Sequence, residues 1–165
     1  MATILVTGCL GFIGSHFVNY ILKETHYNII GFNRNTSQKN LHRLDDIYNS
    51  ENGEIYENDR FNLVYGDLSD NSALSGMAEN VDYIVNFAAK TFVDHSIRDP
   101  APFIQSNIVG TYNILEEARR SNLAYDNIKR FIQVSTDEVY GAILNGAYKE
   151  DARLNPTNPY AASKA

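Results

Sequence analysis

Residues 1–14 read Met-Ala-Thr-Ile-Leu-Val-Thr-Gly-Cys-Leu-Gly-Phe-Ile-Gly, and this stretch decides the fold. Its apolar run predicts a short buried strand that ends at Gly8, and apolar side chains at helical spacing from Phe12 to Leu22 predict a helix. Glycines placed between a strand and a helix permit a tight turn, and they let backbone N–H groups approach a pyrophosphate at the positive end of the helix. The stretch therefore predicts the phosphate-binding turn of a dinucleotide-binding domain, with contacts from Gly8, Gly11, Phe12, Ile13 and Gly14.

Strand and helix patterns alternate along the rest of the chain. Because apolar strands spaced by helices form parallel sheets with right-handed crossovers, residues 1–165 predict one α/β domain, a doubly wound parallel sheet of the NAD(P)-binding Rossmann type. The last helical pattern begins at Pro159 and the sequence stops one turn later, so we expect a fragment of a longer two-domain enzyme whose C-terminal substrate domain is missing. Further strands are predicted at 28–32, 61–65, 81–87 and 131–134, an exposed charged insertion at 50–60, and helices at 41–48 and from Pro102 onward, the latter with Ile104, Ile108, Tyr112, Leu115 and Ala118 on one face.

The composition narrows the class of function. With 14 Lys and Arg against 20 Asp and Glu, the net charge of −6 argues against a nucleic-acid partner, which needs a clustered positive face. The single cysteine, Cys9, excludes a disulfide framework and fits a reducing compartment, and without a nearby base we interpret it as a packing residue. The four histidines lack metal-ligand spacing, and no apolar stretch suffices for a signal peptide or a membrane span. We therefore expect a cytoplasmic protein with neither a metal site nor a membrane partner.

The end of the second predicted strand bears on the choice of cofactor. An acidic residue about 20 positions after the glycines would bind the ribose 2′-hydroxyl of NAD, but Asn33 stands there and Arg34 follows. A neutral side chain beside an arginine favours the 2′-phosphate of NADP, and hydroxyl and lysine side chains at 36, 37 and 39 continue the pattern. Arg34 could instead stack on the adenine. Asp67 and Leu68, after the third strand, are expected at the edge of the adenine pocket, although Asp67 could equally cap the next helix.

Two groups of residues could supply acid/base chemistry. Tyr160 and Lys164 are four positions apart and lie on one helix face, and a nearby ammonium stabilises a phenolate that can act as a base near neutral pH. The stretch from Ser135 to Glu138 follows the fifth predicted strand, at the sheet edge where α/β proteins bind ligands. Two neighbouring carboxyl groups can divide into an acid and a base, particularly when they are buried. The alternative is an exposed turn that caps a helix.

Five motifs in this order resemble the extended short-chain dehydrogenase/reductase family. The Thr-Asp-Glu triplet at Thr136 is similar to that of the family's dTDP-glucose 4,6-dehydratases, and the resemblance covers essentially the whole chain but only the N-terminal half of a family member. The motifs are Gly-x-x-Gly-x-x-Gly at Gly8, Asn-Phe-Ala-Ala at Asn86, Ser-Asn-Ile-Val-Gly-Thr at Ser106, Ser-Thr-Asp-Glu-Val-Tyr-Gly at Ser135 and Tyr-x-x-x-Lys at Tyr160.

This resemblance implies a redox-neutral cycle on a sugar nucleotide. Tyr160, assisted by Lys164 and Thr136, would take the C4 hydroxyl proton while hydride passes to the nicotinamide. Glu138 would then remove the C5 proton and Asp137 would protonate the departing C6 hydroxyl, giving a 4-keto-6-deoxy sugar. The resemblance also implies a homodimer. Cofactor contacts implied in the same way come from Ala88, Ala89, Asn107, Ser135, Tyr160 and Lys164, with Asn107 also able to stabilise an irregularity in its helix.

Departures from the family pattern leave alternatives open. Family members usually carry an acidic residue where this chain has Lys90, beside the sugar site, which leaves the sugar unidentified. The dTDP-glucose dehydratase resemblance implies NAD, whereas the Asn33-Arg34 loop resembles that of NADP-using GDP-mannose 4,6-dehydratases. A sugar-nucleotide 4-epimerase or decarboxylase would use Tyr160 and Lys164 without the acid pair. A third possibility is a cofactor-binding fragment without turnover.

Overall fold

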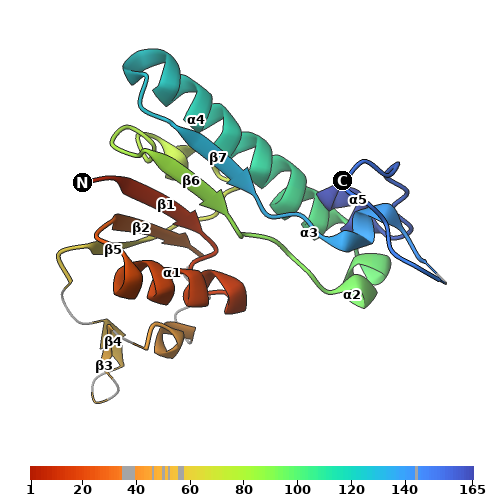
Figure 1. The fold of residues 1–165 in the computed structure, drawn as a ribbon, viewed down its shortest axis with the longest axis horizontal. Coiled ribbons are helices and arrows are strands. Elements are labelled where there is room, and N and C mark those ends of the chain that lie inside the picture. Colours follow the sequence, from red (N-terminus) through yellow and green to blue (C-terminus); the bar gives the residue numbers. More distant parts are fainter. Residues whose placement is uncertain (35–39, 46, 50, 52, 56–57, 144) are drawn as a thin grey trace.

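The computed structural model describes residues 1–165 apart from 35–39, 46, 50, 52, 56–57 and 144 (Figure 1). Its centre is a five-stranded sheet in the order β5-β2-β1-β6-β7, and every neighbouring pair runs parallel. The change of direction in strand order at β1 is typical of the doubly wound fold, so the fold-class prediction is confirmed. The strands are β1 (Thr3–Thr7), β2 (Asn28–Asn33), β5 (Phe61–Tyr65), β6 (Tyr83–Asn86) and β7 (Arg130–Gln133).

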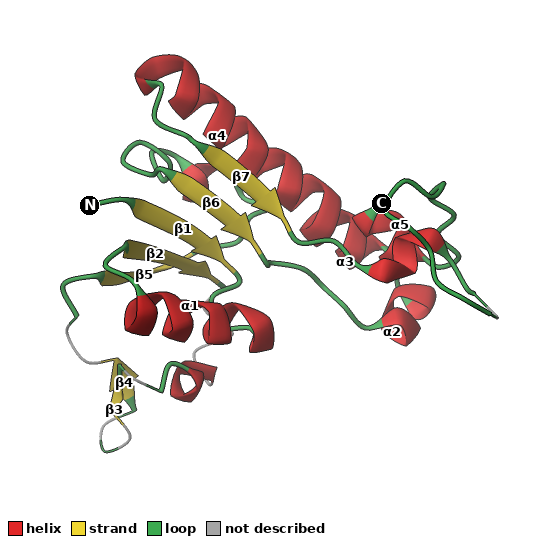
Figure 2. Ribbon diagram, viewed as in Figure 1, coloured by secondary structure: helices red, strands yellow, loops and turns green. Residues whose placement is uncertain are grey.

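Helices α1 (Phe12–Glu24) and α4 (Gly110–Tyr125) lie on opposite faces of this sheet (Figure 2). Alternate side chains of β1 point to opposite faces, as the pleat of a strand requires. Ile4 and Val6 belong to the core on the α1 side, while Leu5 belongs to the core on the α4 side. The two apolar cores fix the position of the glycine turn that joins β1 to α1.

The helix predicted from Pro102 contains a π-helical segment and buries a different face from the one expected. It runs as α3 (Ala101–Phe103), a π-helix (Ile104–Val109) and α4 without a break. Four of the five predicted apolar positions are exposed, and Ala118 alone is buried. The buried face is largely polar because its side chains bond to neighbouring loops: Asn113 donates to the Leu68 carbonyl at 2.8 Å and Ser121 to the Ala78 carbonyl at 2.9 Å.

The predicted helix at 41–48 is wrong. Residues 40–43 form one turn of 3₁₀ helix, and a short antiparallel hairpin follows, made of β3 (Tyr48–Asn49) and β4 (Glu54–Ile55). The buried side chains of Leu44 and Ile47 produced the helix-like spacing, but successive turns place them in the core, with backbone bonds from Leu44 to Leu41 and from Ile47 to Leu44. β4 falls within the insertion predicted at 50–60, whereas β3 immediately precedes it.

Three short helical elements gather beyond the carboxyl ends of the strands (Figure 1). These are α2 (Val93–Arg98), the 3₁₀ helix η4 (Asp137–Tyr140) and α5 (Pro159–Lys164); another 3₁₀ helix, η2 (Asn71–Leu74), follows β5. Among the described residues, no helix combines the length and apolar character needed to cross a membrane. In the same part of the chain, no three His, Cys, Asp or Glu side chains gather closely enough to hold a metal ion.

Candidate active site

The glycine turn after β1 is closely packed on all sides. Gly8 has a φ of +68°, and a Cβ atom there would lie 2.8 Å from the backbone nitrogen of Ala88. Its N–H donates to the carbonyl of Phe32 at 2.8 Å, and its own carbonyl accepts from Gly11 at 2.9 Å. A Cβ atom on Gly14 would collide with the same Gly8 carbonyl. Only glycine fits at positions 8 and 14, and the glycine at position 8 lets the chain approach the segment that follows β6.

The first turn of α1 leaves its N–H groups available to an external anion. Gly11 is the N-cap and brings no side-chain acceptor to them. The Phe12 and Ile13 side chains project outward and are 70% and 60% exposed, whereas Gly14 is buried against the turn. This uncapped, glycine-lined helix start fits a dinucleotide pyrophosphate, because both the N–H groups and the helix dipole favour negative charge there.

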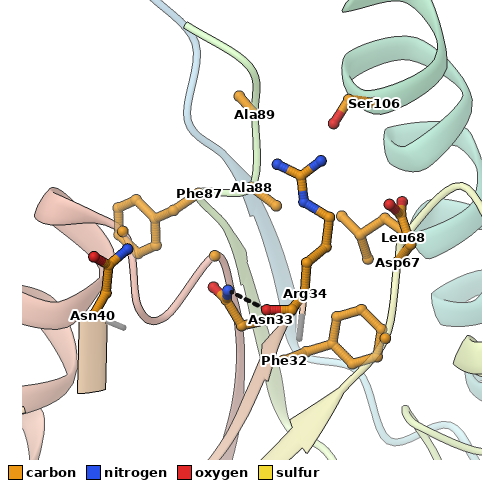
Figure 3. Close-up of a pocket in the computed structure, with 13 residues that line it drawn as sticks. Phe32, Asn33, Arg34, Asn40, Asp67, Leu68, Phe87, Ala88, Ala89 and Ser106 are labelled. Carbon is orange, nitrogen blue, oxygen red and sulfur yellow. Dashed lines mark hydrogen bonds between the residues drawn. The ribbon is translucent and has the colours of Figure 1, made fainter. Parts of the chain in front are cut away.

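A cleft opens beside this turn, at the carboxyl ends of β1, β2, β5 and β6 (Figure 3). It brings together many of the residues assigned to the cofactor from the sequence: Gly8, Gly11, Asn33, Arg34, Asp67, Leu68, Ala88 and Ala89. Five further lining residues were missed, although four of them adjoin a predicted residue or belong to a quoted motif: Phe32, Asn40, Gly66, Phe87 and Ser106. We call this cleft the dinucleotide pocket.

Asn33 and Arg34 occupy one wall of the pocket. Asn33 is buried, and its carboxamide oxygen accepts from the N–H of Leu10 in the glycine turn at 3.2 Å. Its amide nitrogen donates to the Arg34 carbonyl at 3.3 Å, and the Arg34 guanidinium reaches across the pocket toward Ser106 (Figure 3). Asn33 therefore joins the end of β2 to the phosphate-binding turn. The residues predicted to extend this pattern at 36, 37 and 39 lie outside the described residues.

Asp67 lines the pocket as predicted, and it does not cap the following helix, which was the alternative. One carboxylate oxygen accepts from the Ser69 N–H at 2.9 Å and from the Ser69 hydroxyl at 2.8 Å. The N-cap of η2 is Asp70 rather than Asp67. Asp67 thus stabilises the turn after β5 and presents its side chain to the pocket.

Helix α5 carries Tyr160 and Lys164 and is anchored at its start. Asn158 is the N-cap and accepts from the Ala161 N–H at 2.8 Å, while Pro159 occupies the first helical position. The Tyr160 N–H donates to the hydroxyl of Ser96 on α2 at 3.1 Å. Tyr160 is buried, and its ring packs edge-on against Phe103 with 6.4 Å between centroids.

Lys164 is held by the end of β7. Its ammonium donates to the Val134 carbonyl at 2.6 Å, and its own carbonyl accepts from the Ser135 hydroxyl at 2.8 Å. Burial lowers the pKa of Lys164 below its ordinary value, because the charged form loses hydration. Ser135, predicted as a cofactor contact, therefore contacts the backbone of α5.

Asn107 lies in the π-helical segment and is buried, so the helix irregularity that the resemblance implied is observed. Its carboxamide accepts from the Lys90 N–H at 2.8 Å and donates to the Lys90 carbonyl at 3.0 Å. It also donates to the Ser163 hydroxyl on α5 at 2.8 Å. Asn107 thus joins the loop after β6 to the helix that carries Tyr160. π-Helical segments of this kind often accompany functional sites.

The acid pair lies beside the start of α5. Thr136 caps η4, and its hydroxyl oxygen lies 3.4 Å from the Glu138 N–H and 3.3 Å from the Asp137 carboxylate. The Glu138 carboxylate accepts from the Asn158 side chain at 3.3 Å. Asp137 is exposed and Glu138 half-buried, so only Glu138 has part of the burial that would help the two carboxyl groups to divide into an acid and a base.

The predicted residues therefore form two neighbouring groups rather than one cavity. The catalytic candidates gather around α5 and η4, and the other predicted residues that do not line the dinucleotide pocket are Phe12, Ile13, Gly14, Asn107 and Ser135; Tyr160 and Lys164, predicted for both roles, do not line it either.

Cys9 is fully buried, and burial raises the pKa of its thiol to about 12. It is a packing residue, as predicted.

Comparisons with known proteins identify the family of this chain and several of its relatives. The family described as GDP-mannose 4,6 dehydratase matches residues 5–165. The low-salt glycan biosynthesis protein Agl12 of Haloferax volcanii is 40% identical over 165 residues, and a dTDP-glucose 4,6-dehydratase of Actinoplanes sp. is 40% identical over 162 residues. Both alignments cover 98% of this chain and 48% of the relative. The chain thus spans about half the length of the curated relatives that it matches.

Solved structures give the same result. The dTDP-glucose 4,6-dehydratase DesIV of Streptomyces venezuelae, crystallised with NAD and TYD bound, superposes with a TM-score of 0.83 at 36% identity, over 98% of this chain and 48% of that chain. A UDP-Glc/GlcNAc 4-epimerase of Campylobacter jejuni superposes with a TM-score of 0.81 at 29% identity, over 99% of this chain and 46% of that chain. Both kinds of enzyme share this fold.

Proposed function

The chain belongs to the GDP-mannose 4,6 dehydratase family, and from this premise we propose that it is the dinucleotide-binding half of a sugar-nucleotide 4,6-dehydratase, close to the dTDP-glucose dehydratases. We place residues 1–165 as one domain of a longer two-domain enzyme, which agrees with their coverage of about half of each relative. The observation that carries the choice of reaction is the hydrogen bond between Glu138 and Asn158. It connects the acid pair to the first turn of the helix that carries Tyr160.

We assign the chemistry to residues on α5 and η4. Tyr160 would accept the proton of the substrate C4 hydroxyl, with the Lys164 ammonium favouring the phenolate and Thr136 close to the same hydroxyl. Oxidation at C4 acidifies the C5 proton, which Glu138 would remove, while Asp137 would donate a proton to the departing C6 hydroxyl. The acid must be protonated while the base is ionised, and this explains the need for two carboxyl groups side by side.

The cofactor that we propose is NADP or NAD, bound in the dinucleotide pocket. A nicotinamide ring, when bound, accepts hydride from the substrate carbon and returns it, so the cycle has no net redox change. The N–H groups of Phe12 and Ile13 would hold the pyrophosphate, and Asp67 and Leu68 would border the adenine. Asn33 and Arg34 favour NADP, because no carboxylate stands where it would repel a 2′-phosphate; the relatives crystallised with NAD favour NAD.

Product mass is the decisive measurement. The full-length protein is incubated with dTDP-glucose, GDP-mannose, CDP-glucose, UDP-glucose and UDP-glucuronate, and the products are analysed by mass spectrometry and by chromatography that separates 4-epimers. A dehydratase removes one water from one of these substrates. An epimerase leaves the mass unchanged, and the structural similarity to a 4-epimerase makes that reaction the second candidate. A decarboxylase would release carbon dioxide from a uronate substrate. Dinucleotide binding without any product would identify a binding unit alone.

We also propose a homodimer and a cytoplasmic location. The dimer is supported by an exposed apolar face along the π-helix and α4, whose side chains are between 45% and 63% exposed: Ile104, Ile108, Tyr112 and Leu115. Light scattering on the full-length protein measures the oligomeric state. A strictly monomeric full-length protein would contradict the dimer.

A further inference from the structure

A basic trough adjoins the dinucleotide pocket. Two open cavities share Lys90, His95 and Phe103 in their lining, and one of them also shares Arg34 with the dinucleotide pocket. We define the basic trough as these two cavities together. Its lining contains several basic side chains and a single acidic one: Arg34, Lys90, His95, Arg98 and Asp99.

This concentration of positive charge contrasts with a chain whose net charge is −6. Within the described part of the chain, the ion pairs join Arg119, Arg120 and Lys129 to acids elsewhere, and none includes a basic residue of the trough. Like charges that share one hollow repel one another, and a bound anion would remove that repulsion. The trough therefore has the electrostatics of an oxyanion site.

A helix terminus alone does not explain this cluster. His95 and Arg98 lie in the last turn of α2, where positive charge is favoured by the helix dipole. Lys90 comes from the loop after β6 and Arg34 from the end of β2, so three separate elements bring basic side chains to one place. Lys90 is also half-buried, and the Asn107 carboxamide bonds to both its N–H and its carbonyl, which fixes its backbone.

The trough lies next to the proposed catalytic tyrosine. Phe103 lines both of its cavities, and the Phe103 ring packs against the ring of Tyr160. On α2, Ser96 follows His95 and bonds to the Tyr160 backbone. The ring of Phe103 would therefore lie between an anion in the trough and the ring of Tyr160.

We infer that the basic trough binds an oxyanion of the substrate, with Lys90 as its central ligand. The oxyanion is either the diphosphate of the sugar nucleotide or an acidic group on its sugar. Phosphate and carboxylate oxygens both accept charge-assisted hydrogen bonds from lysine and arginine. Assignment of the anion to the substrate rests on the proposed function, whereas the anion site itself depends only on the charges that line the trough.

Calorimetric titration of the whole chain tests this inference without requiring turnover. The probes are inorganic phosphate, UDP and glucuronate, each titrated with and without saturating NADP. Phosphate should bind saturably and more weakly as salt rises. Lys90→Gln should weaken binding about tenfold, the loss expected for one charge-assisted hydrogen bond. Arg98→Gln, at an exposed position that cannot disturb the core, should also weaken it. Lys23→Gln on α1 is the matched control and should change nothing.

The two sources of the anion give different results. Tight UDP binding that depends on Lys90 identifies the diphosphate, and Lys90-dependent glucuronate binding identifies an acidic sugar. Equal effects of the Lys90 and Lys23 substitutions, or no saturable binding of any probe, would overturn the anion site. If the full-length protein dehydrates its substrate but no anion binds in the trough, this inference alone is contradicted. If an anion binds there but no substrate is dehydrated, the proposed function alone is contradicted.

Discussion

The N–H of Tyr160 donates a hydrogen bond of 3.1 Å to the hydroxyl of Ser96, which is fully buried and 64 positions earlier in the chain. The same hydroxyl donates to the Val93 carbonyl at 2.7 Å. N–H groups in the first turn of a helix have no partner within that helix, so this bond satisfies a donor that would otherwise be buried unpaired. Ser96 thereby fixes the Tyr160 backbone from a different element of the fold.

Replacing Ser96 by alanine should reduce kcat of the full-length enzyme roughly 10- to 100-fold, because a small shift of α5 misplaces the phenol. KM should change much less, since the substitution touches no substrate. Hydrogen exchange should show faster exchange at the Tyr160 amide. Ser96→Thr, which keeps the hydroxyl, is the control and should restore protection. Unchanged exchange and kcat in the alanine variant would show that the bond does not position Tyr160.

Replacing Glu138 by glutamine should abolish exchange of the substrate C5 proton with solvent, since the amide is not a base. The Asn158 contact can persist because the glutamine carbonyl oxygen still accepts a hydrogen bond. Reduction of the bound nicotinamide, followed at 340 nm, should continue because Tyr160 is unaffected. C5 exchange that survives in this variant removes the assignment of Glu138 as the base.

Replacing Asn33 by aspartate should shift cofactor preference toward NAD, with NADP affinity falling at least about tenfold through repulsion of the 2′-phosphate. The carboxylate can still accept from the Leu10 N–H, so the glycine turn should keep its geometry. It loses the donor that bonds to the Arg34 carbonyl. Titration of both cofactors into both proteins measures the shift. A wild-type protein that already prefers NAD would contradict the NADP expectation.

Replacing Gly8 by alanine should destabilise the fold by roughly 2–5 kcal/mol, from positive-φ strain and from contact with the Ala88 backbone. Gly146→Ala is the matched control, because Gly146 has a φ of +86° but open space around its Cβ position. It should cost only about 1–2 kcal/mol, the strain alone. Urea unfolding measures both, and dinucleotide affinity should fall only in the Gly8 variant. Equal losses of stability would mean that the close approach to Ala88 has no energetic weight.

The buried thiol of Cys9 predicts a dependence of stability on pH. Burial raises its pKa from 9.0 to about 12, so above about pH 9 the unfolded chain releases a proton that the folded chain retains. The free energy of unfolding should therefore fall as pH rises from about 9 to about 12, by at most about 1.4 kcal/mol per pH unit from this group. Cys9→Ala should flatten that decline. Parallel profiles for the two proteins would contradict it.

Much of the fold could be predicted because the glycine turn and the strands depend on local sequence. The turn after β1 needs residues without a Cβ atom, and that requirement is visible in three glycines at fixed spacing. β1 and β5 are near-continuous apolar runs, which local pattern also reveals. Local pattern also placed Asn33 and Asp67 at the pocket, since each lies within two residues of the end of a predicted strand.

The remainder depended on contacts between distant residues. Apolar periodicity indicated that the helix face with Ile108 and Tyr112 would be buried. The face that is buried instead carries Asn113 and Ser121, whose partners are loop carbonyls far away in the sequence. Ser96 gave no signal for the same reason, because its partner is a backbone N–H on another helix. Whether Asp137 is buried or exposed could not be predicted from its neighbours in the sequence either, because its exposure depends on what covers η4.

Helix α5 is held at Tyr160, Ser163 and Lys164 by partners 64, 56 and 30 residues earlier in the chain. Six residues are too few to remain helical in isolation. During synthesis this helix can therefore take shape only against elements that have already assembled, and Tyr160, the proposed base, reaches its place only after them. On the ribosome, the dinucleotide pocket would therefore form before the residues to which we assign the acid/base chemistry are in place.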